Sequence, residues 1–423
     1  MASTLLIRNA TIVDPKSRHN GKERDIWIRN GVIESIKAKI TDTKAKELEA
    51  KGACVSPGWI DVGVQSGDPG FEHREDFESV AAAAAAGGYT GLVCQPNTMP
   101  VTHSKTEVLY LKNHTKDYLV NFYPLGAVSR DCEGGDITEM NDMHHAGAVA
   151  FTDGRISIQD SGLMKRALQY VKAFDGLILN YPIDKKLAHK GQMHEGLIST
   201  TLGMKGIPSL SEELMVGRDI SLAEYTNSKL HLSSISTNGS IDLVKEARAN
   251  DLNVTASVAA LNLTLDDEHL LGFDSNYKVL PPLREKNDMK ALIKALKNGH
   301  IDFITSNHNP HDEESKKLEF PLADFGVIGL ETTYALLNTH LGKQCSQEEF
   351  VNWLSLNARK ILRLPIPTVE AGAAANLTIF DPNKEWTYSK DQIRSKSHNS
   401  PFIGTTFTGK VLGVVNNGQV LLV

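Results

Sequence analysis

Residues 80–95 read VAAAAAAGGYTGLVCQ, and this stretch indicates how the middle of the chain folds. The alanine-rich segment 80–86 predicts a helix, because alanine has the highest intrinsic helix propensity. The pair Gly87-Gly88 ends that helix, since glycine is favoured where helices stop. The apolar run 91–95 then predicts a short buried strand. A helix that leads directly into a strand is half of the repeating unit of a parallel α/β fold.

The same alternation continues outward through most of the chain. Further strands are predicted at 121–128, 148–151, 177–180, 229–233, 253–257 and 303–306. Periodic helices are predicted between several of them, at 161–174, 240–249 and 288–296. Repetition to seven or eight units predicts a (β/α)8 barrel of the TIM type, whose active site lies where the strands end. The residues just after each strand are therefore the ones to examine.

Both ends of the chain are rich in short strands. Turn signals such as Asn30-Gly31 and Asn416-Asn417-Gly418 separate apolar runs, and Asn-Gly between two such runs is a strong hairpin signal. We therefore expect one small composite β-sandwich domain built from both termini. The expected organisation is an N-terminal sandwich part, the barrel and a C-terminal sandwich part, at 1–55, 56–365 and 366–423.

Composition narrows the class of protein. The chain has 423 residues, 41% of them hydrophobic and 23% charged, which is ordinary globular composition. The formal net charge of -6, without a basic cluster, argues against a nucleic-acid partner. The four cysteines are scattered, which disfavours a disulfide scaffold or a cysteine zinc site. No apolar run of membrane-spanning length and no signal-peptide layout is present, so we expect a cytoplasmic protein that does not enter membranes.

Short motifs spread along the chain carry a family resemblance. They are PGWID (57–61), DPGFEH (68–73), AGGYT (86–90), PNT (96–98), GQMHEGLISTTLGMKGIP (191–208), LPPLR (280–284), GVIGLE (326–331) and SKSHNSPF (395–402). Together and in this order they resemble dihydroorotases of the amidohydrolase superfamily, nearly end to end. The resemblance implies the barrel and the composite β-domain. It also implies interconversion of carbamoyl-aspartate and dihydroorotate in pyrimidine synthesis, with one or two zinc ions and an aspartate that carries the proton.

The metal-binding positions of that family are largely replaced here. A His-x-His pair follows the first barrel strand in the family, and this chain has Gly63 and Gln65 at those positions. The arginine that grips the substrate carboxylate aligns with Gly67. Glycine offers no ligand atom, and a neutral glutamine amide is a poor zinc ligand.

The later ligand positions agree with this replacement. Two family histidines align with Tyr181 and Ser234, and the family aspartate that acts as acid and base aligns with Asn307. An asparagine cannot take up and return a proton near neutral pH. Asp153 is the one retained candidate ligand, although its motif is one residue shorter than the family's Asp-Asp-Gly. One carboxylate does not hold zinc in a three- or four-ligand site, so we predict no metal cofactor and assign no catalytic residue.

Other residues at the expected barrel mouth match the family's substrate pocket. They are Asn97, Arg284, His308 and His311. One interpretation is a vestigial pocket that still binds a small-molecule anion. The other is that the asparagine and the histidines cap loop backbones while Arg284 pairs with a local carboxylate. The spacing of His308 and His311 also allows a replacement metal site, but no third ligand is evident from the sequence.

Three functions of different class follow. The leading hypothesis is a non-catalytic dihydroorotase homologue, because some relatives without metal ligands assemble with aspartate carbamoyltransferase, the enzyme one step earlier. The alternatives are an active cyclic amidohydrolase with an unusual metal site, and a sensor that binds a pyrimidine intermediate without turning it over. The resemblance also implies a homo-oligomer, most simply a dimer.

Overall fold

The computed structural model describes residues 4–41 and 45–423, and its central element is a parallel barrel. The eight barrel strands are hydrogen-bonded in chain order from the first to the last. They are β6 (Trp59–Val64), β7 (Tyr89–Cys94), β8 (Asn121–Gly126), β9 (Ala150–Phe151), β10 (Ile178–Asn180), β13 (Leu230–Leu232), β14 (Val254–Ala259) and β15 (Phe303–Thr305). The (β/α)8 architecture expected from the sequence is confirmed, and each predicted strand is present.

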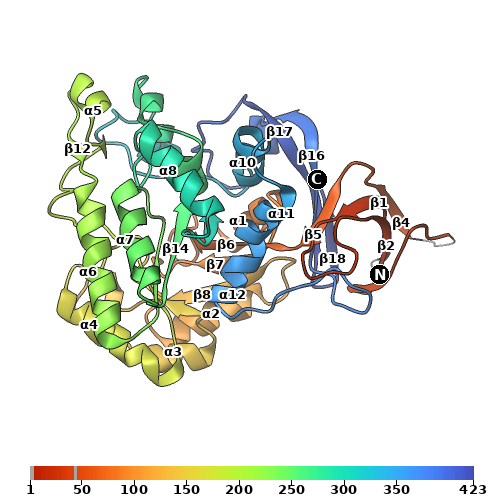
Figure 1. Ribbon diagram of the computed structural model, residues 1–423, viewed down its shortest axis with the longest axis horizontal. Helices are drawn as coiled ribbons and strands as arrows, with labels where there is room; N and C mark the ends of the chain where they lie inside the picture. The colour runs from red at the N-terminus through yellow and green to blue at the C-terminus, as the bar shows by residue number, and fades with distance from the viewer. Residues whose placement is uncertain (1–3, 42–44) are drawn as a thin grey trace.

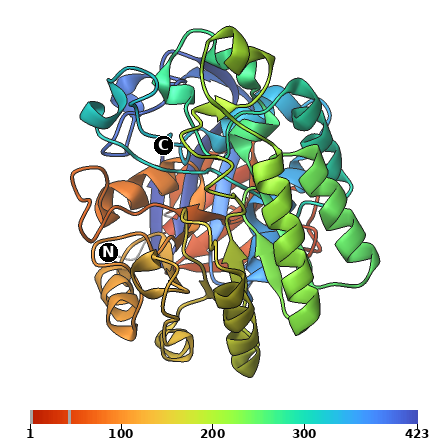
Figure 2. The same cartoon turned by 90° about the vertical axis from the view of Figure 1, so that its left-hand side faces the viewer.

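Helices surround these strands (Figures 1 and 2). They are α1 (Phe77–Ala86), α2 (Lys105–Thr115), α3 (Met140–Ala146), α4 (Ser161–Val171), α5 (Leu197–Thr201), α6 (Leu210–Thr226), α7 (Asn238–Ala249), α8 (Lys286–Lys297), α9 (Glu313–Lys316), α10 (Thr333–Leu341), α11 (Gln347–Val351) and α12 (Asn357–Ile361). The alanine run forms most of α1, whose Asp76 N-cap accepts a hydrogen bond from Ser79 N. Its small side chains pack closely against the barrel, and Ala83, Ala84 and Ala85 are buried.

The barrel closes between its first and last strands. The carboxylate of Asp61 on β6 accepts a 2.8 Å hydrogen bond from Ser306 N and a second one from Ser306 Oγ, just past the end of β15. Four residues further along, Gln65 N donates to His308 O at 3.2 Å. Asp61 is completely buried, and burial raises the pKa of its carboxyl to about 6 although the Ser306 hydrogen bonds oppose the shift.

The two ends of the chain share a second eight-stranded sheet, so the segments drawn in red and in dark blue lie side by side in Figure 1. Its junction is the antiparallel pairing of β5 (Cys54–Pro57) with β16 (Leu377–Thr387). The Asn30-Gly31 turn joins β2 (Glu23–Arg29) to β3 (Val32–Lys37), as the hairpin signal predicted. Both turn residues have positive φ angles, of 53° and 74°. The strands are β1 (Thr4–Ile12), β2 (Glu23–Arg29), β3 (Val32–Lys37), β4 (Lys46–Glu49), β5 (Cys54–Pro57), β16 (Leu377–Thr387), β17 (Thr406–Asn416) and β18 (Gln419–Leu422).

One excursion leaves the barrel between β10 and β13. It carries the short parallel pair β11 (Met193–His194) and β12 (Gly206–Ile207) on either side of α5. Within residues 4–41 and 45–423, no helix combines the length and the apolar character that crossing a membrane requires.

The closing contact of the barrel gives a stability prediction. Asp61→Ala leaves both Ser306 donors without their acceptor in a buried place, and we expect it to lower the free energy of unfolding by about 3 kcal/mol. Asp61→Asn keeps an acceptor for Ser306 N and should cost less than half as much. Urea unfolding followed by circular dichroism measures both variants. Equal losses in the two variants would contradict a role for the hydrogen bonds.

His231 on β13 gives a pH prediction. Its ring bonds Thr255 Oγ1 at 2.9 Å and Ser257 Oγ at 3.1 Å, and burial followed by the charge of Arg248 lowers its pKa to about 3. The unfolded chain therefore takes up a proton below pH 6.5 that the folded chain refuses. The free energy of unfolding of the wild type, relative to His231→Gln, should fall by about 2.5 kcal/mol from pH 7 to pH 4.5 in urea titrations. Parallel pH curves for the two proteins would refute this.

Candidate functional site

A small cavity lies at the carboxyl ends of the barrel strands, and we call it the mouth cavity. Its volume is about 30 Å³, and a buried water needs roughly 10–15 Å³, so it has room for about two. None of its lining residues is a histidine, cysteine, aspartate or glutamate. They are Val62, Gly63, Gln95, Thr152, Gly154, Arg155, Leu179, Tyr181, Ser233, Ser234, Ser257, Thr305 and Asn307.

Most of the replaced metal positions meet in this cavity. Gly63, Tyr181, Ser234 and Asn307 line it, from four different strand ends. Gly63 has a φ of 91° at a break in the β6–β7 register. Gln65 lies beside the cavity, where its Nε2 is 3.4 Å from Asn97 Oδ1. The fold therefore brings these positions together, as the family alignment expected, but with side chains of a different chemistry.

Asp153 does not line the mouth cavity. Its carboxylate accepts hydrogen bonds from Val128 N at 2.9 Å, from Ser129 N at 2.8 Å and from Ser129 Oγ at 2.5 Å. These donors belong to the loop after β8, so the carboxylate holds that loop in place. Its neighbour Gly154 lines the cavity instead. A Cβ atom there would lie only 1.8 Å from Asn97 Oδ1, so no side chain fits at this position.

Arg155 is a residue of the cavity that sequence reasoning did not assign. Its Nη2 donates to Asn307 Oδ1 at 2.8 Å and to Asn307 O at 3.2 Å. Its Nε has no hydrogen-bond partner among the described residues. Burial lowers the pKa of the guanidinium to about 10. In the sequence, Arg155 is a charged residue shortly after the predicted strand 148–151. The family motif pointed to Asp153 in the same segment instead.

Zinc, which the family resemblance implies, does not fit this donor set. Zinc in proteins is bound by thiolate, imidazole and carboxylate groups, and the mouth cavity offers amides, hydroxyls and a phenol. Burial also raises the pKa of the Tyr181 phenol, which keeps it protonated. The guanidinium of Arg155 adds a positive charge that repels a metal cation. These residues therefore do not form a zinc site.

Arg284 lies outside the lining of the mouth cavity. Its guanidinium is 2% exposed and bonds Ser236 Oγ, Ile207 O and Glu212 Oε2 at 3.0, 3.0 and 3.4 Å. This is the pairing with a local carboxylate that the second interpretation expected. Asn97 likewise binds backbone groups, because its Nδ2 donates to Asp153 O and its Oδ1 accepts from Arg155 N, both at 3.0 Å.

The two histidines after β15 also bind structural partners. His308 Nε2 is 3.3 Å from Glu75 Oε2, and its Nδ1 accepts from Gly329 N at 3.2 Å. His311 Nε2 is 3.1 Å from Phe325 O, and burial lowers the pKa of this ring to about 4. Neither lines the mouth cavity. The pocket candidates of the sequence analysis therefore do not converge on one ligand site.

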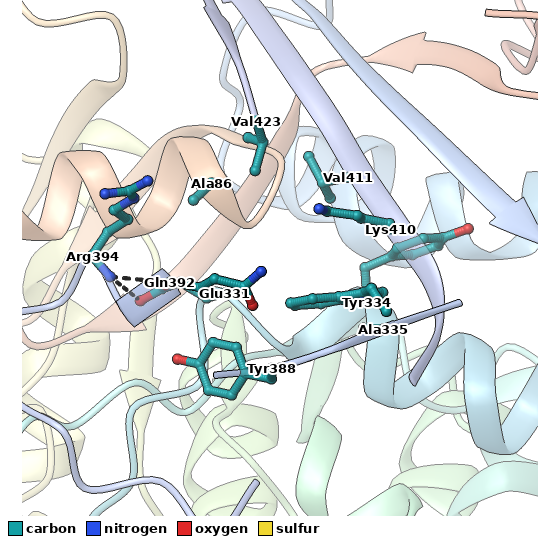
Figure 3. A pocket seen from close by; sticks show the side chains of 11 residues that line it. Ala86, Glu331, Tyr334, Ala335, Tyr388, Gln392, Arg394, Lys410, Val411 and Val423 are labelled. Atoms are coloured by element: carbon teal, nitrogen blue, oxygen red, sulfur yellow. Dashed lines mark hydrogen bonds between the residues drawn. The ribbon is translucent and has the colours of Figure 1, made fainter. Parts of the chain in front are cut away.

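A larger cavity of about 180 Å³ lies at the junction of the barrel and the terminal sheet (Figure 3). Tyr334 and Tyr388 line it together with Glu331. The carboxylate of Glu331 accepts hydrogen bonds from the backbone N–H groups of Arg394 and Ser395, all at 3.1 Å. Burial still raises its pKa to about 7. The contacts of this carboxylate tie the C-terminal segment to the barrel.

Comparison with known proteins identifies the family. A dihydro-orotase-like family model matches residues 52–240, and an amidohydrolase family model matches residues 186–421. The chain is 41% identical over 422 residues to a dihydroorotase of Pelotomaculum thermopropionicum, covering 99% of this chain and 98% of the relative. It is 39% identical over 421 residues to a dihydroorotase of Acetivibrio thermocellus, covering 99% of both.

Solved structures agree on the fold. An L-hydantoinase (dihydropyrimidinase) from Arthrobacter aurescens superposes with a TM-score of 0.86 at 24% identity, covering 100% of this chain and 96% of that one. A D-hydantoinase superposes with a TM-score of 0.83 at 24% identity, covering 99% and 95%. At this identity the likeness concerns the fold alone. The full-length sequence matches go further: the chain belongs to the dihydroorotase family of the amidohydrolases, proteins of pyrimidine biosynthesis.

Proposed function

We propose that this chain is a dihydroorotase-family protein without the family's metal-dependent activity, and that it acts as a non-catalytic partner of aspartate carbamoyltransferase. The observation that carries the proposal is the lining of the mouth cavity, which contains no imidazole, thiolate or carboxylate and does contain the guanidinium of Arg155. Hydrolysis of a cyclic amide needs an activated water and a group that carries a proton. The lining supplies neither.

Asn307 is the clearest single case. It occupies the position of the family's acid and base, and both its side-chain groups are already engaged. Its Nδ2 donates to Leu280 O at 3.0 Å, and its Oδ1 accepts from Arg155. An amide in two hydrogen bonds fixes the loop and the arginine in place, and it has no proton to exchange near neutral pH.

The features that build the scaffold are intact beside the altered cavity. The barrel is closed by Asp61 and Ser306, and Arg359 under its floor is 1% exposed with its Nη2 3.2 Å from Gly58 O. A protein that serves as an assembly partner needs this fold and an exposed surface, without a working cavity. Such a role predicts that the fold is retained while the residues of the cavity are replaced.

A surface for the partner is available on α6. Leu210 and Leu214 are four residues apart, so they lie on one face of the helix, and they are 50% and 51% exposed. Apolar side chains exposed together mark interaction surfaces more often than isolated ones do. We place the contact with aspartate carbamoyltransferase on this face, and a second copy of the chain is the competing occupant.

The alternatives find less support in the same residues. An active enzyme would need donors that the mouth cavity lacks, although the relatives bear the name dihydroorotase. A sensor would need space for carbamoyl-aspartate, which has two carboxylates and a carbamoyl group. The present volume of about 30 Å³ accommodates about two waters. A cell that makes pyrimidines with this chain then needs a second, active dihydroorotase.

The proposal predicts no dihydroorotate hydrolysis. The purified protein, alone or with added zinc, should show a rate no higher than the buffer blank, while an active dihydroorotase in parallel gives full turnover. The assay follows loss of dihydroorotate absorbance. Turnover that zinc stimulates and a chelator abolishes would overturn the proposal.

A restored variant serves as the control for that assay. The triple variant Gly63→His, Gln65→His and Asn307→Asp should also be inactive, because Tyr181 and Ser234 still supply no zinc ligand. Residue 63 adds strain, since a Cβ at its φ of 91° would lie 2.9 Å from Gln95 Nε2. Zinc-dependent turnover in this variant would show that the ligand positions are wrongly assigned.

The proposal also predicts a complex with aspartate carbamoyltransferase from the same organism. The two proteins should co-elute in size-exclusion chromatography at micromolar concentration. Leu210→Glu with Leu214→Glu should weaken the complex at least tenfold, because both charges would be buried at the contact. Leu322→Glu, at a leucine outside α6 that is 67% exposed, is the control and should leave the complex unchanged. Separate elution of the two wild-type proteins would contradict the partnership.

A further inference from the structure

A histidine and two carboxylates meet away from the mouth cavity, where the β11–β12 excursion packs on the loop before α8. His194 ends β11, Asp267 begins a short 3-10 turn, and Glu285 is the N-cap residue of α8. One ligand atom of each lies within 4.8 Å of the other two. Zinc bonds of about 2.1 Å in a tetrahedron place ligand atoms about 3.4 Å apart, so small side-chain movements complete such a site.

Asp267 supplies an independent sign of a missing partner. The residue is 4% exposed, and its Oδ2 has no hydrogen-bond partner among the described residues. A buried carboxylate oxygen without a partner is costly, and a bound ion is one partner that removes this cost. The backbone holds the group there, because Asp267 N donates to Arg284 O at 3.0 Å.

The surrounding charges favour a cation. Lys286 pairs with Glu268 at 2.6 Å and with Asp266 at 3.8 Å, and Arg284 pairs with Glu212 at 3.4 Å. The two nearby basic side chains therefore already have carboxylate partners. Arg284 Nη1 is also 3.1 Å from His194 Nδ1, so it is Nε2 of this ring that faces Glu285, 4.0 Å from its Oε1. Neither forms an ion pair with Asp267 or Glu285 in the described part of the chain, and both of those carboxylates are left without a compensating basic side chain.

Gly196 keeps the space between the ligands open. A Cβ atom at this residue would lie 2.9 Å from Glu285 Oε1 and 3.4 Å from His194 Nε2. The side chain of Glu285 makes no capping hydrogen bond to α8 and is 48% exposed, so it is free to turn toward an ion. The three ligand residues come from three separate segments, so an ion among them would join those segments.

We propose that His194, Asp267 and Glu285 bind one divalent cation of the zinc class, as a structural clamp between the β11–β12 excursion and the start of α8. The site is separate from the mouth cavity and shares no residue with it. One imidazole nitrogen and two carboxylate oxygens are a donor set that Zn²⁺ accepts, with water in the fourth position.

The test is zinc binding by the full-length protein, first stripped with a chelator. Equilibrium dialysis against Zn²⁺ with elemental analysis should give one zinc per chain. Asp267→Asn and Glu285→Gln should each weaken binding at least tenfold. Glu195→Gln removes an exposed carboxylate next to His194 and leaves the ion pairs of Lys286 in place, so it is the matched control, which should stay within twofold of the wild type. Zinc binding unchanged in both ligand variants, or no binding by the wild type at 100 µM Zn²⁺, would overturn the proposal.

Thermal unfolding separates ligation from a purely structural role. Zinc should raise the unfolding midpoint of the wild type and leave that of Asp267→Asn unchanged, because only the folded wild type gains a ligand. Without zinc, Asp267→Asn should unfold no earlier than the wild type, since it removes an unpaired buried charge. A lower midpoint in this variant together with no zinc effect on the wild type would assign Asp267 a structural role and overturn the proposal. Zinc-stimulated dihydroorotate hydrolysis that persists in Asp267→Asn would count against the proposed function alone.

Discussion

The carboxylate of Asp61 holds the first and last barrel strands together through Ser306, and the other features of the barrel mouth depend on that closure. It is the completely buried acceptor for a backbone N–H and a hydroxyl where β6 meets the end of β15. Among the described residues β6 and β15 form no ladder with each other, so these hydrogen bonds and that from Gln65 N to His308 O join the two ends of the sheet. With this seam closed, the residues that follow the strands are forced to converge at one end.

That convergence brings Gly63, Tyr181, Ser234 and Asn307 around one cavity. The fold brings together the positions that the family resemblance assigns to metal ligands, and it does so regardless of which side chains occupy them. In this chain Arg155 extends into the space and is held by Asn307. A cationic group stands where a metal ion would need anionic ligands, so the electrostatics of the mouth are opposite to those of a zinc site. In this chain the fold sets where these side chains meet, and the sequence sets their chemistry.

The cluster of His194, Asp267 and Glu285 is a second place where the fold brings distant side chains together. Its members lie in segments whose paths are set by the β11–β12 pair and by the backbone bond from Asp267 N to Arg284 O. In this cluster the buried Oδ2 of Asp267 has no hydrogen-bond partner among the described residues. The lining of the mouth cavity, by contrast, contains no carboxylate. Among the described residues, the His/Asp/Glu group spaced to hold a metal therefore lies outside the mouth cavity.

Local signals in the sequence were sufficient for the barrel and for the terminal sheet. Alanine propensity and Gly87-Gly88 defined α1, and Asn30-Gly31 defined a hairpin, because helix ends and tight turns depend on neighbouring residues. The sequence also indicated that Gly63, Tyr181 and Asn307 lie at the mouth of the barrel, since each has its place at the end of a strand. What only the tertiary structure decided was where each side chain finds its partner: Asp153 with Ser129, Arg284 with Glu212, and Arg155 in the cavity. Such partners are far apart along the chain, and their choice depends on packing that no local pattern encodes.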